Sequence, residues 1–192
     1  KRSLVVGVLI VVMIMGIGAG LKNGYNRLVL MEEEINGNWA QVENQYQRRY
    51  DLIPNLVATV SGYAAHEKET FTQVTEARAR VGQITLTPEM LNNPQMLEKF
   101  QAAQSSLGNA LSRLMAVAEN YPELKANQNF LALQDQLEGT ENRIATERRR
   151  FNESIKAYNR TVRLFPTIIY AGWFGFEKRP YFEAASEAST AP

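Results

Sequence analysis

An uncharged apolar run near the start of the chain constrains its fold more than any other feature. It reads SLVVGVLIVVMIMGIGAGL from Ser3 to Leu21 and is followed by Lys22. As a helix it would extend about 28 Å, close to the hydrocarbon thickness of a bilayer. A secretory signal peptide is the alternative, because Gly18 to Gly20 resembles a cleavage site. We favour a single transmembrane anchor over residues 1–22, with the lipid bilayer as its partner.

Glycines within this run and just after it have a spacing that favours association of two helices. Gly16 and Gly20 form one GxxxG pair, and Gly20 and Gly24 form a second. Glycine at this spacing lets two helix backbones approach closely in lipid. We therefore predict self-association into a homo-oligomer through Gly16, Gly20 and Gly24.

The basic residues on the two sides of the run are nearly balanced. Lys1 and Arg2 precede it, and Lys22 and Arg27 follow it. Acidic residues carry little weight in the positive-inside rule. A short basic N-terminus before an apolar run is the usual signal-anchor layout, so we expect the body on the non-cytoplasmic side of the membrane.

The body, residues 23–166, shows an apolar period of helices. From Trp39 to Val81, bulky residues recur at steps of three and four, as in a coiled-coil-like seam. This predicts one long helix that ends near Gly82. Pro54 lies inside it, where proline removes one hydrogen bond and favours a kink. A break at Pro54 would give one helix more.

Two further heptad patterns follow a linker over 83–95. One predicts a helix over about 97–121, and the next predicts a helix over about 122–165, which Pro166 ends. Short links make neighbouring helices antiparallel. The predicted fold is all-α: a transmembrane helix followed by an elongated antiparallel bundle of three long helices, or four if Pro54 breaks the first.

Composition and motifs exclude several classes of function. The 21 basic and 20 acidic residues nearly cancel, which argues against nucleic-acid binding, and no cysteine is available for thiolate chemistry. The only histidine, His66, precedes Glu67, but a zinc peptidase helix would need a second histidine where Thr70 stands. We expect His66 and Glu67 to form hydrogen bonds across the bundle, and we predict no metal, no cofactor and no enzyme activity.

Charged and amide side chains stand on or beside seam positions that otherwise hold apolar residues. Such groups can fix helix register and partner choice. We single out Arg48, Arg49, Asp51, His66, Glu67, Glu141, Arg148, Arg149 and Asn152. The alternative for Arg148 to Arg150 is a basic patch that binds a partner protein.

Residues 167–182 are aromatic and irregular, and residues 183–192 are small and polar, which predicts a disordered tail. Trp173, Phe174 and Phe176 could plug the bundle end, dock a neighbouring subunit or touch lipid. An unbroken first helix to Gly82 would reach about 87 Å outward. On that geometry the aromatic segment lies far from the bilayer; a turn at Pro54 would reverse the conclusion.

Several stretches resemble LemA family proteins. YNRLV (25–29), NWAQVENQYQRRYDLIPNLVATVSGYAAHE (38–67) and ARA (77–79) are similar to the N-terminal half of that family. LEGTENRIATERRRFNESIKAYN (137–159), FP (165–166), GF (175–176) and YFEA (181–184) are similar to its C-terminal half. The resemblance implies a bacterial membrane-anchored helical bundle without established catalytic residues. Some family members are associated with magnetosome membranes, and one was described as a surface antigen.

These observations favour a non-enzymatic membrane scaffold or adaptor. One alternative is a regulatory subunit that binds a membrane enzyme, such as a protease, through the Arg148–Arg150 face or the aromatic tail. A metal-dependent hydrolase that uses His66 is the weakest hypothesis.

Overall fold

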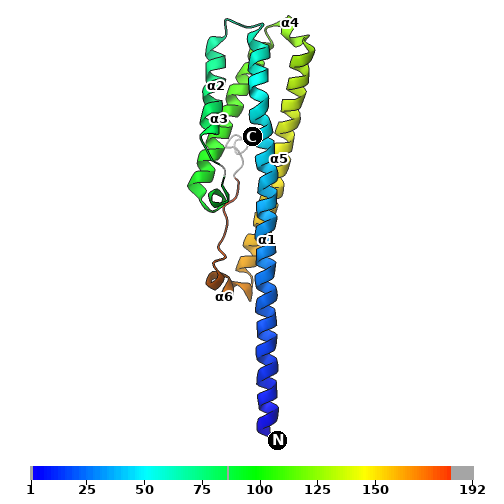
Figure 1. Cartoon of the computed structure of the whole chain (residues 1–192), viewed down its shortest axis with the longest axis vertical. Coiled ribbons are helices and arrows are strands. Elements are labelled where there is room, and N and C mark those ends of the chain that lie inside the picture. Colours follow the sequence, from blue (N-terminus) through cyan, green and yellow to red (C-terminus); the bar gives the residue numbers. More distant parts are fainter. Residues whose placement is uncertain (1, 86, 183–192) are drawn as a thin grey trace, which may run out of the picture.

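In the computed structural model, which describes residues 2–85 and 87–182, all regular secondary structure of the described residues is helical (Figure 1). No strand occurs in that described part, so the all-α prediction is confirmed. The predicted disordered tail, 183–192, lies outside the described residues. The long helices are α1 (Arg2–Ser61), α2 (Lys68–Gly82), α3 (Pro94–Ala118) and α5 (Gln128–Arg163). The short ones are η1 (Pro88–Asn92), α4 (Pro122–Lys125), α6 (Thr167–Ala171) and η2 (Gly172–Phe174).

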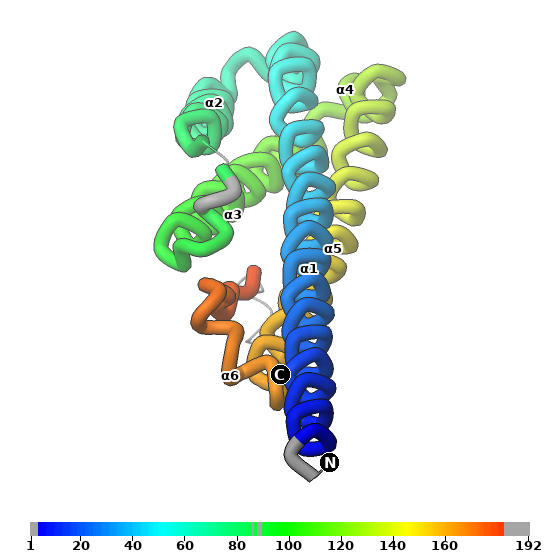
Figure 2. The backbone as a smooth tube through the Cα atoms, turned by 60° about the horizontal axis from the view of Figure 1, so that its bottom comes forward, coloured from blue at the N-terminus to red at the C-terminus, as the bar shows by residue number. Residues whose placement is uncertain are grey.

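The long helices form two antiparallel pairs. α1 packs mainly against α5, and α2 packs mainly against α3. Figure 2 shows the α2–α3 pair on one side of α1 and α5 on the other, and Figure 1 shows the first turns of α1 projecting alone. The core lies between these pairs in two parts. The part nearer the base holds Trp39, Tyr46, Phe100, Phe151 and Tyr158; the far part holds Leu56, Val74, Leu107, Leu114 and Phe130.

The first helix ends earlier than predicted. α1 continues through Pro54, so proline does not break it, but it stops at Ser61 and α2 begins only at Lys68. The prediction of one helix to Gly82 is wrong. The heptad spacing persists across the turn because Ala64, Val74 and Val81 enter the same core from the returning chain. Periodicity reports which side chains are buried and does not report the direction of the helix that carries them.

The break at Pro54 is avoided by a contact from the next helix. Proline lacks the N–H that would bond to the carbonyl four residues earlier, which belongs to Tyr50. The Nε of Arg78 in α2 donates to that carbonyl oxygen at 3.3 Å. The Arg78 guanidinium also lies 3.8 Å from the centre of the Tyr50 ring. α2 therefore satisfies the backbone group that Pro54 leaves open.

The last long helix begins and ends at recognisable signals. The predicted helix over 122–165 is interrupted after Lys125, and α5 starts anew where the Asn127 side chain accepts a hydrogen bond from the Phe130 N–H at 3.0 Å. It ends at Arg163, three residues before Pro166. Phe165, the last residue of the predicted helix, lies beyond the end of α5 and is exposed.

Because α1 turns back at 62–67, α5 returns along α1 and brings the aromatic segment to the base of the bundle (Figure 1). There the rings of Tyr25 and Phe174 lie 5.2 Å apart. The expectation that this segment lies far from the apolar run is wrong, because it depended on a first helix that extends to Gly82.

Candidate functional site

The lone histidine is not part of a polar cluster. His66 is exposed in the turn after α1. Its neighbour Glu67 accepts a hydrogen bond from the Tyr121 hydroxyl at 3.4 Å, so of the two residues only Glu67 makes the predicted contact across the bundle. Among residues 2–85 and 87–182, no group of three His, Asp or Glu side chains could hold a metal ion. Polar side chains of the described residues instead make contacts between helices.

Arg49 is the centre of one such network. It is 4% exposed and joins α1 to both α3 and α5. Its Nη1 donates to Glu141 Oε1 at 2.8 Å, and its Nη2 donates to the backbone oxygen of Gln104 at 3.2 Å. Nη2 also contacts the Gln104 side-chain oxygen. The sequence indicated Arg49 and Glu141 but not their pairing, which links positions 92 residues apart.

The other predicted polar residues divide into buried contacts and solvent. The Arg148 guanidinium lies 4.2 Å from the centre of the Phe182 ring, and Arg150 Nη1 pairs with Glu147 at 2.9 Å. Arg149 is exposed. Two more exposed residues are Arg48 and Asp51, and Asp51 accepts a hydrogen bond from Gln47 at 2.8 Å. Arg148, Arg149 and Arg150 therefore do not form one uniform basic patch.

Two asparagines on α5 hold the chain after η2 against the bundle. The Asn152 side chain donates to the Phe182 carbonyl at 2.7 Å and accepts from the Phe182 N–H at 2.8 Å. Asn159 makes the same pair of bonds with the backbone of Arg179, each at 2.9 Å. We call these two asparagines and residues 176–182 the C-terminal clasp. Asn159 was missed by sequence reasoning, although its spacing of seven from Asn152 places both on one helix face.

A buried tyrosine and an ion pair also hold the C-terminal clasp against α1. Arg179 Nη2 pairs with Glu32 Oε1 at 2.8 Å, and the Tyr158 hydroxyl donates to the same oxygen at 3.1 Å. Burial raises the pKa of the Tyr158 phenol above its ordinary value, and the Glu32 carboxylate raises it further. Glu32 begins an acidic run that ends at Glu34, and it is drawn into the bundle because Arg179 returns to meet it.

The three aromatic residues predicted to act in docking differ in how deeply they are buried. Phe176 is buried in the core and lies 5.5 Å from Tyr25, ring centre to ring centre. Trp173 is 79% exposed and Phe174 is 49% exposed. Thus Phe176 plugs the base of the bundle, while Trp173 and Phe174 face outward.

The three glycines predicted to mediate self-association differ in how open they are to a second helix. A Cβ built at Gly16 or Gly20 would meet nothing within 4 Å. At Gly24 it would overlap the Tyr170 hydroxyl and lie 2.8 Å from the Tyr170 Cζ, because α6 packs there. Self-association through Gly16 and Gly20 stays a prediction, whereas Gly24 is covered by the chain itself.

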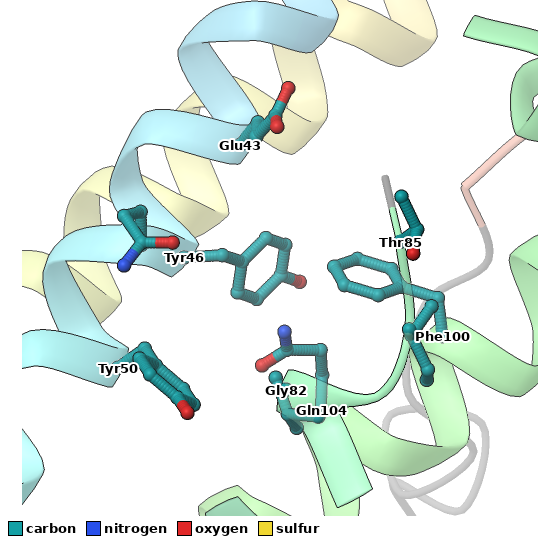
Figure 3. A pocket seen from close by; sticks show the side chains of 10 residues that line it. Glu43, Tyr46, Tyr50, Gly82, Thr85, Phe100 and Gln104 are labelled. Atoms are coloured by element: carbon teal, nitrogen blue, oxygen red, sulfur yellow. The ribbon is translucent and has the colours of Figure 1, made fainter. Parts of the chain in front are cut away.

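A cleft of about 370 Å³ lies beside the Arg49 network (Figure 3). In Figure 3 the Tyr46 ring extends from α1 towards Phe100, and Tyr50 and Gln104 lie below it. Burial raises the pKa of the Tyr46 phenol despite the opposing charges of Arg148 and Arg49. Among the described residues that line the cleft, Glu43 is the only carboxylate. The cleft offers hydrogen bonds and aromatic faces without a nucleophile and base in contact.

Comparisons with known proteins agree with the motifs. The LemA family profile matches residues 38–192. The chain is 30% identical to the magnetosome proteins MamQ 2 and MamQ 1 of Paramagnetospirillum magneticum over 182 residues, covering 86% of this chain and 67% of each relative. It is 29% identical to the magnetosome protein MamQ of Magnetospirillum gryphiswaldense, with the same coverage.

Proposed function

The chain belongs to the LemA family, and on that premise we propose that it is a non-enzymatic scaffold or adaptor, anchored in a bacterial membrane by α1. The observation that carries the proposal is the continuity of α1. Its apolar first part has a mean hydropathy of 2.8 over the most apolar 18-residue window, none of it buried in the bundle, yet the same helix supplies Trp39, Tyr46 and Arg49 to the interior. Because the anchor and the core residues belong to one continuous helix, the anchor would hold the bundle directly at the membrane surface.

The scaffold role is supported by the distribution of polar groups. The best-connected polar side chains, Arg49, Asn152 and Asn159, bond to other parts of the chain and so stabilise its shape. The relatives that the chain resembles are named magnetosome proteins. We propose that this protein acts by presenting a rigid helical surface at a membrane.

Membrane attachment and self-association test the proposal. We expect the protein to float with vesicles after an alkaline carbonate wash and to form oligomers in lipid nanodiscs. Replacing both Gly16 and Gly20 with leucine should reduce the oligomer, because these glycines are open to a second helix. Gly18→Leu is the matched control: it lies at similar depth about 200° around the helix. A monomeric parent protein would contradict self-association, and loss from the vesicles would contradict the anchor.

A regulatory subunit that binds a membrane enzyme is the second candidate. The observation that favours it is a depression of about 460 Å³ lined by Arg149, Lys156 and Tyr181 among other residues. A photo-crosslinker placed at Arg149, with the exposed Arg48 position as control, should capture one dominant foreign protein if this candidate is correct. Crosslinks only between copies of the chain would favour the scaffold.

A further inference from the structure

Large apolar side chains project from the base of the bundle between the end of α5 and the end of η2. Each is about half exposed or more; the members are Leu164, Phe165, Ile168, Ile169, Trp173 and Phe174, which we call the basal patch. The opposite side of the same segment is fixed, because Thr167, Tyr170 and Ala171 are buried. Exposure of the patch therefore does not arise from a loose end: its backbone is held against α1 while its apolar side faces outward.

Two contacts fix the position of the basal patch along the axis of α1, relative to the apolar run. Tyr170 of α6 packs on Gly24, and the ring of Phe174 lies 5.2 Å from the ring of Tyr25. Tyr25 follows Leu21, the last residue of the run, by four positions, or about 6 Å along the helix. The headgroup region on each side of a bilayer is about 5–8 Å thick. If residues 3–21 fill the hydrocarbon core, the patch lies at the headgroup layer.

The side chains of the patch suit that layer. Tryptophan and other aromatic residues favour the membrane interface, and a contiguous group of exposed apolar side chains on a protein surface marks an interaction site. Lys22, Arg160 and Arg163 are exposed on the adjoining turns, where long basic side chains can reach lipid phosphates. The acidic side chains on the same segments are Glu32, which pairs with Arg179, and the exposed Glu33, Glu34 and Glu177.

We propose that the basal patch inserts into the interfacial layer of the same bilayer that α1 spans. This inference rests on the proposed anchoring by α1. It adds a second attachment point, which lies beside α1 and thereby restricts the tilt of the bundle relative to the membrane. The occupant is lipid, because Phe174 of the patch contacts Tyr25, which lies one helical turn beyond the exposed apolar run of α1.

The two tryptophans of the chain make the contact measurable. Trp173 is 79% exposed within the patch, whereas Trp39 is 5% exposed in the core. Trp39 also lies 18 positions beyond Leu21, about 27 Å along α1. The full chain is placed in phosphatidylcholine–phosphatidylglycerol vesicles whose acyl chains carry bromine. Lipid-borne bromine should quench the emission of Trp173, and Trp173→Phe should remove the quenched component while the Trp39 emission persists.

Other outcomes would overturn the contact. A Trp173 emission that bromine does not quench, but that aqueous iodide does, means that the patch faces water. Shielding from both quenchers means that a protein surface, such as a second copy, covers it. Flotation with the vesicles separates these results from a failure of the anchor: a chain that floats with unquenched Trp173 refutes the patch alone, and a chain that does not float refutes both.

A matched pair of variants checks that the patch itself causes the insertion. Replacing Ile168 and Ile169 with glutamine should reduce the bromine quenching of Trp173 and shift its emission to longer wavelength. Leu131→Gln alters an exposed apolar side chain at the far end of α5 and should change neither. Equal effects of the two changes would overturn the proposal. An unchanged circular dichroism spectrum shows that each variant is folded.

Discussion

Arg49 shows how a charged side chain can occupy a heptad seam without breaking the core. Its guanidinium is buried, but Glu141 and Gln104 accept its hydrogen bonds from two different helices. Glu141 remains 45% exposed at its side chain, so only one member of the ion pair is fully removed from water. The arrangement fixes the register of α1 against α3 and α5, because sliding either helix by one turn would leave Arg49 buried without partners.

Truncating Arg49 should therefore be costly. We expect Arg49→Ala to lower the free energy of unfolding by about 3 kcal/mol, the lower end for breaking a buried pair, because Glu141 can turn to solvent. Urea denaturation followed by circular dichroism measures the change. Arg48→Ala, one position away on the exposed face, should change it by less than about 0.5 kcal/mol. Equal losses in the two variants would show that the network contributes nothing specific.

Tyr158 should make the stability of the bundle fall at alkaline pH. Its folded-state pKa lies above the unfolded value because burial and Glu32 disfavour the phenolate. The unfolded chain therefore loses this proton first as pH rises above about 10, and stability falls from there until the folded-state pKa is passed. We expect the melting temperature to decline above about pH 10 and to decline less steeply in Tyr158→Phe. Identical alkaline profiles would contradict this.

At the scale of elements, α1 and α2 depend on each other at Pro54. An interior proline costs a helix about 3 kcal/mol relative to alanine, partly through the lost hydrogen bond. Arg78 recovers part of that loss by donating to the Tyr50 carbonyl. This contact explains why the chain reverses at 62–67 and not at Pro54: the packed α2 stabilises the helix where it is locally weakest.

A double-mutant cycle tests this dependence. Arg78→Ala should destabilise the parent protein more than it destabilises Pro54→Ala, because an alanine at 54 restores the N–H that bonds to Tyr50. We expect a coupling of about 1 kcal/mol, the size of one hydrogen bond. The loss of the Arg78 contact with the Tyr50 ring occurs in both backgrounds and cancels. A coupling of zero would mean that the carbonyl is satisfied by water.

At the scale of the whole molecule, α1 has two separable parts. Residues 4–20 are exposed throughout, whereas Leu28 and Ile35 are the first side chains of α1 in the core. The apolar run therefore contributes nothing to the packing of the bundle. Its proposed contribution is to anchor the bundle at the membrane.

Truncation should separate anchoring from folding. A chain that begins at Lys22 should keep its helicity and melting temperature while it no longer withstands a carbonate wash on vesicles. A chain that begins at Trp39 is the control, and it should be strongly destabilised because it lacks Leu28 and Ile35 and the Glu32 partner of Arg179. Unfolding of the first truncation would show that the run also supports the bundle.

The sequence alone determined the helical class, the family and the buried faces. Heptad spacing and the run from Ser3 to Leu21 depend on local geometry, which neighbouring residues specify. It also indicated Arg49, Glu141, Arg148 and Asn152 as unusual, because charged or amide groups at apolar positions need a structural reason. Asn159, Glu32 and Arg179 were missed, since their partners lie at least 20 residues away and only the returning chain brings them together.

Only the tertiary structure decided where the chain turns. A seam of bulky residues continues with the same spacing whether the helix goes straight on or folds back onto the same core, so residues 62–67 looked helical. That one reversal changes which end of the bundle receives residues 164–182. It places Tyr170 and Phe174 against Gly24 and Tyr25, just beyond the apolar run, because the direction of each helix depends on which neighbour buries its face.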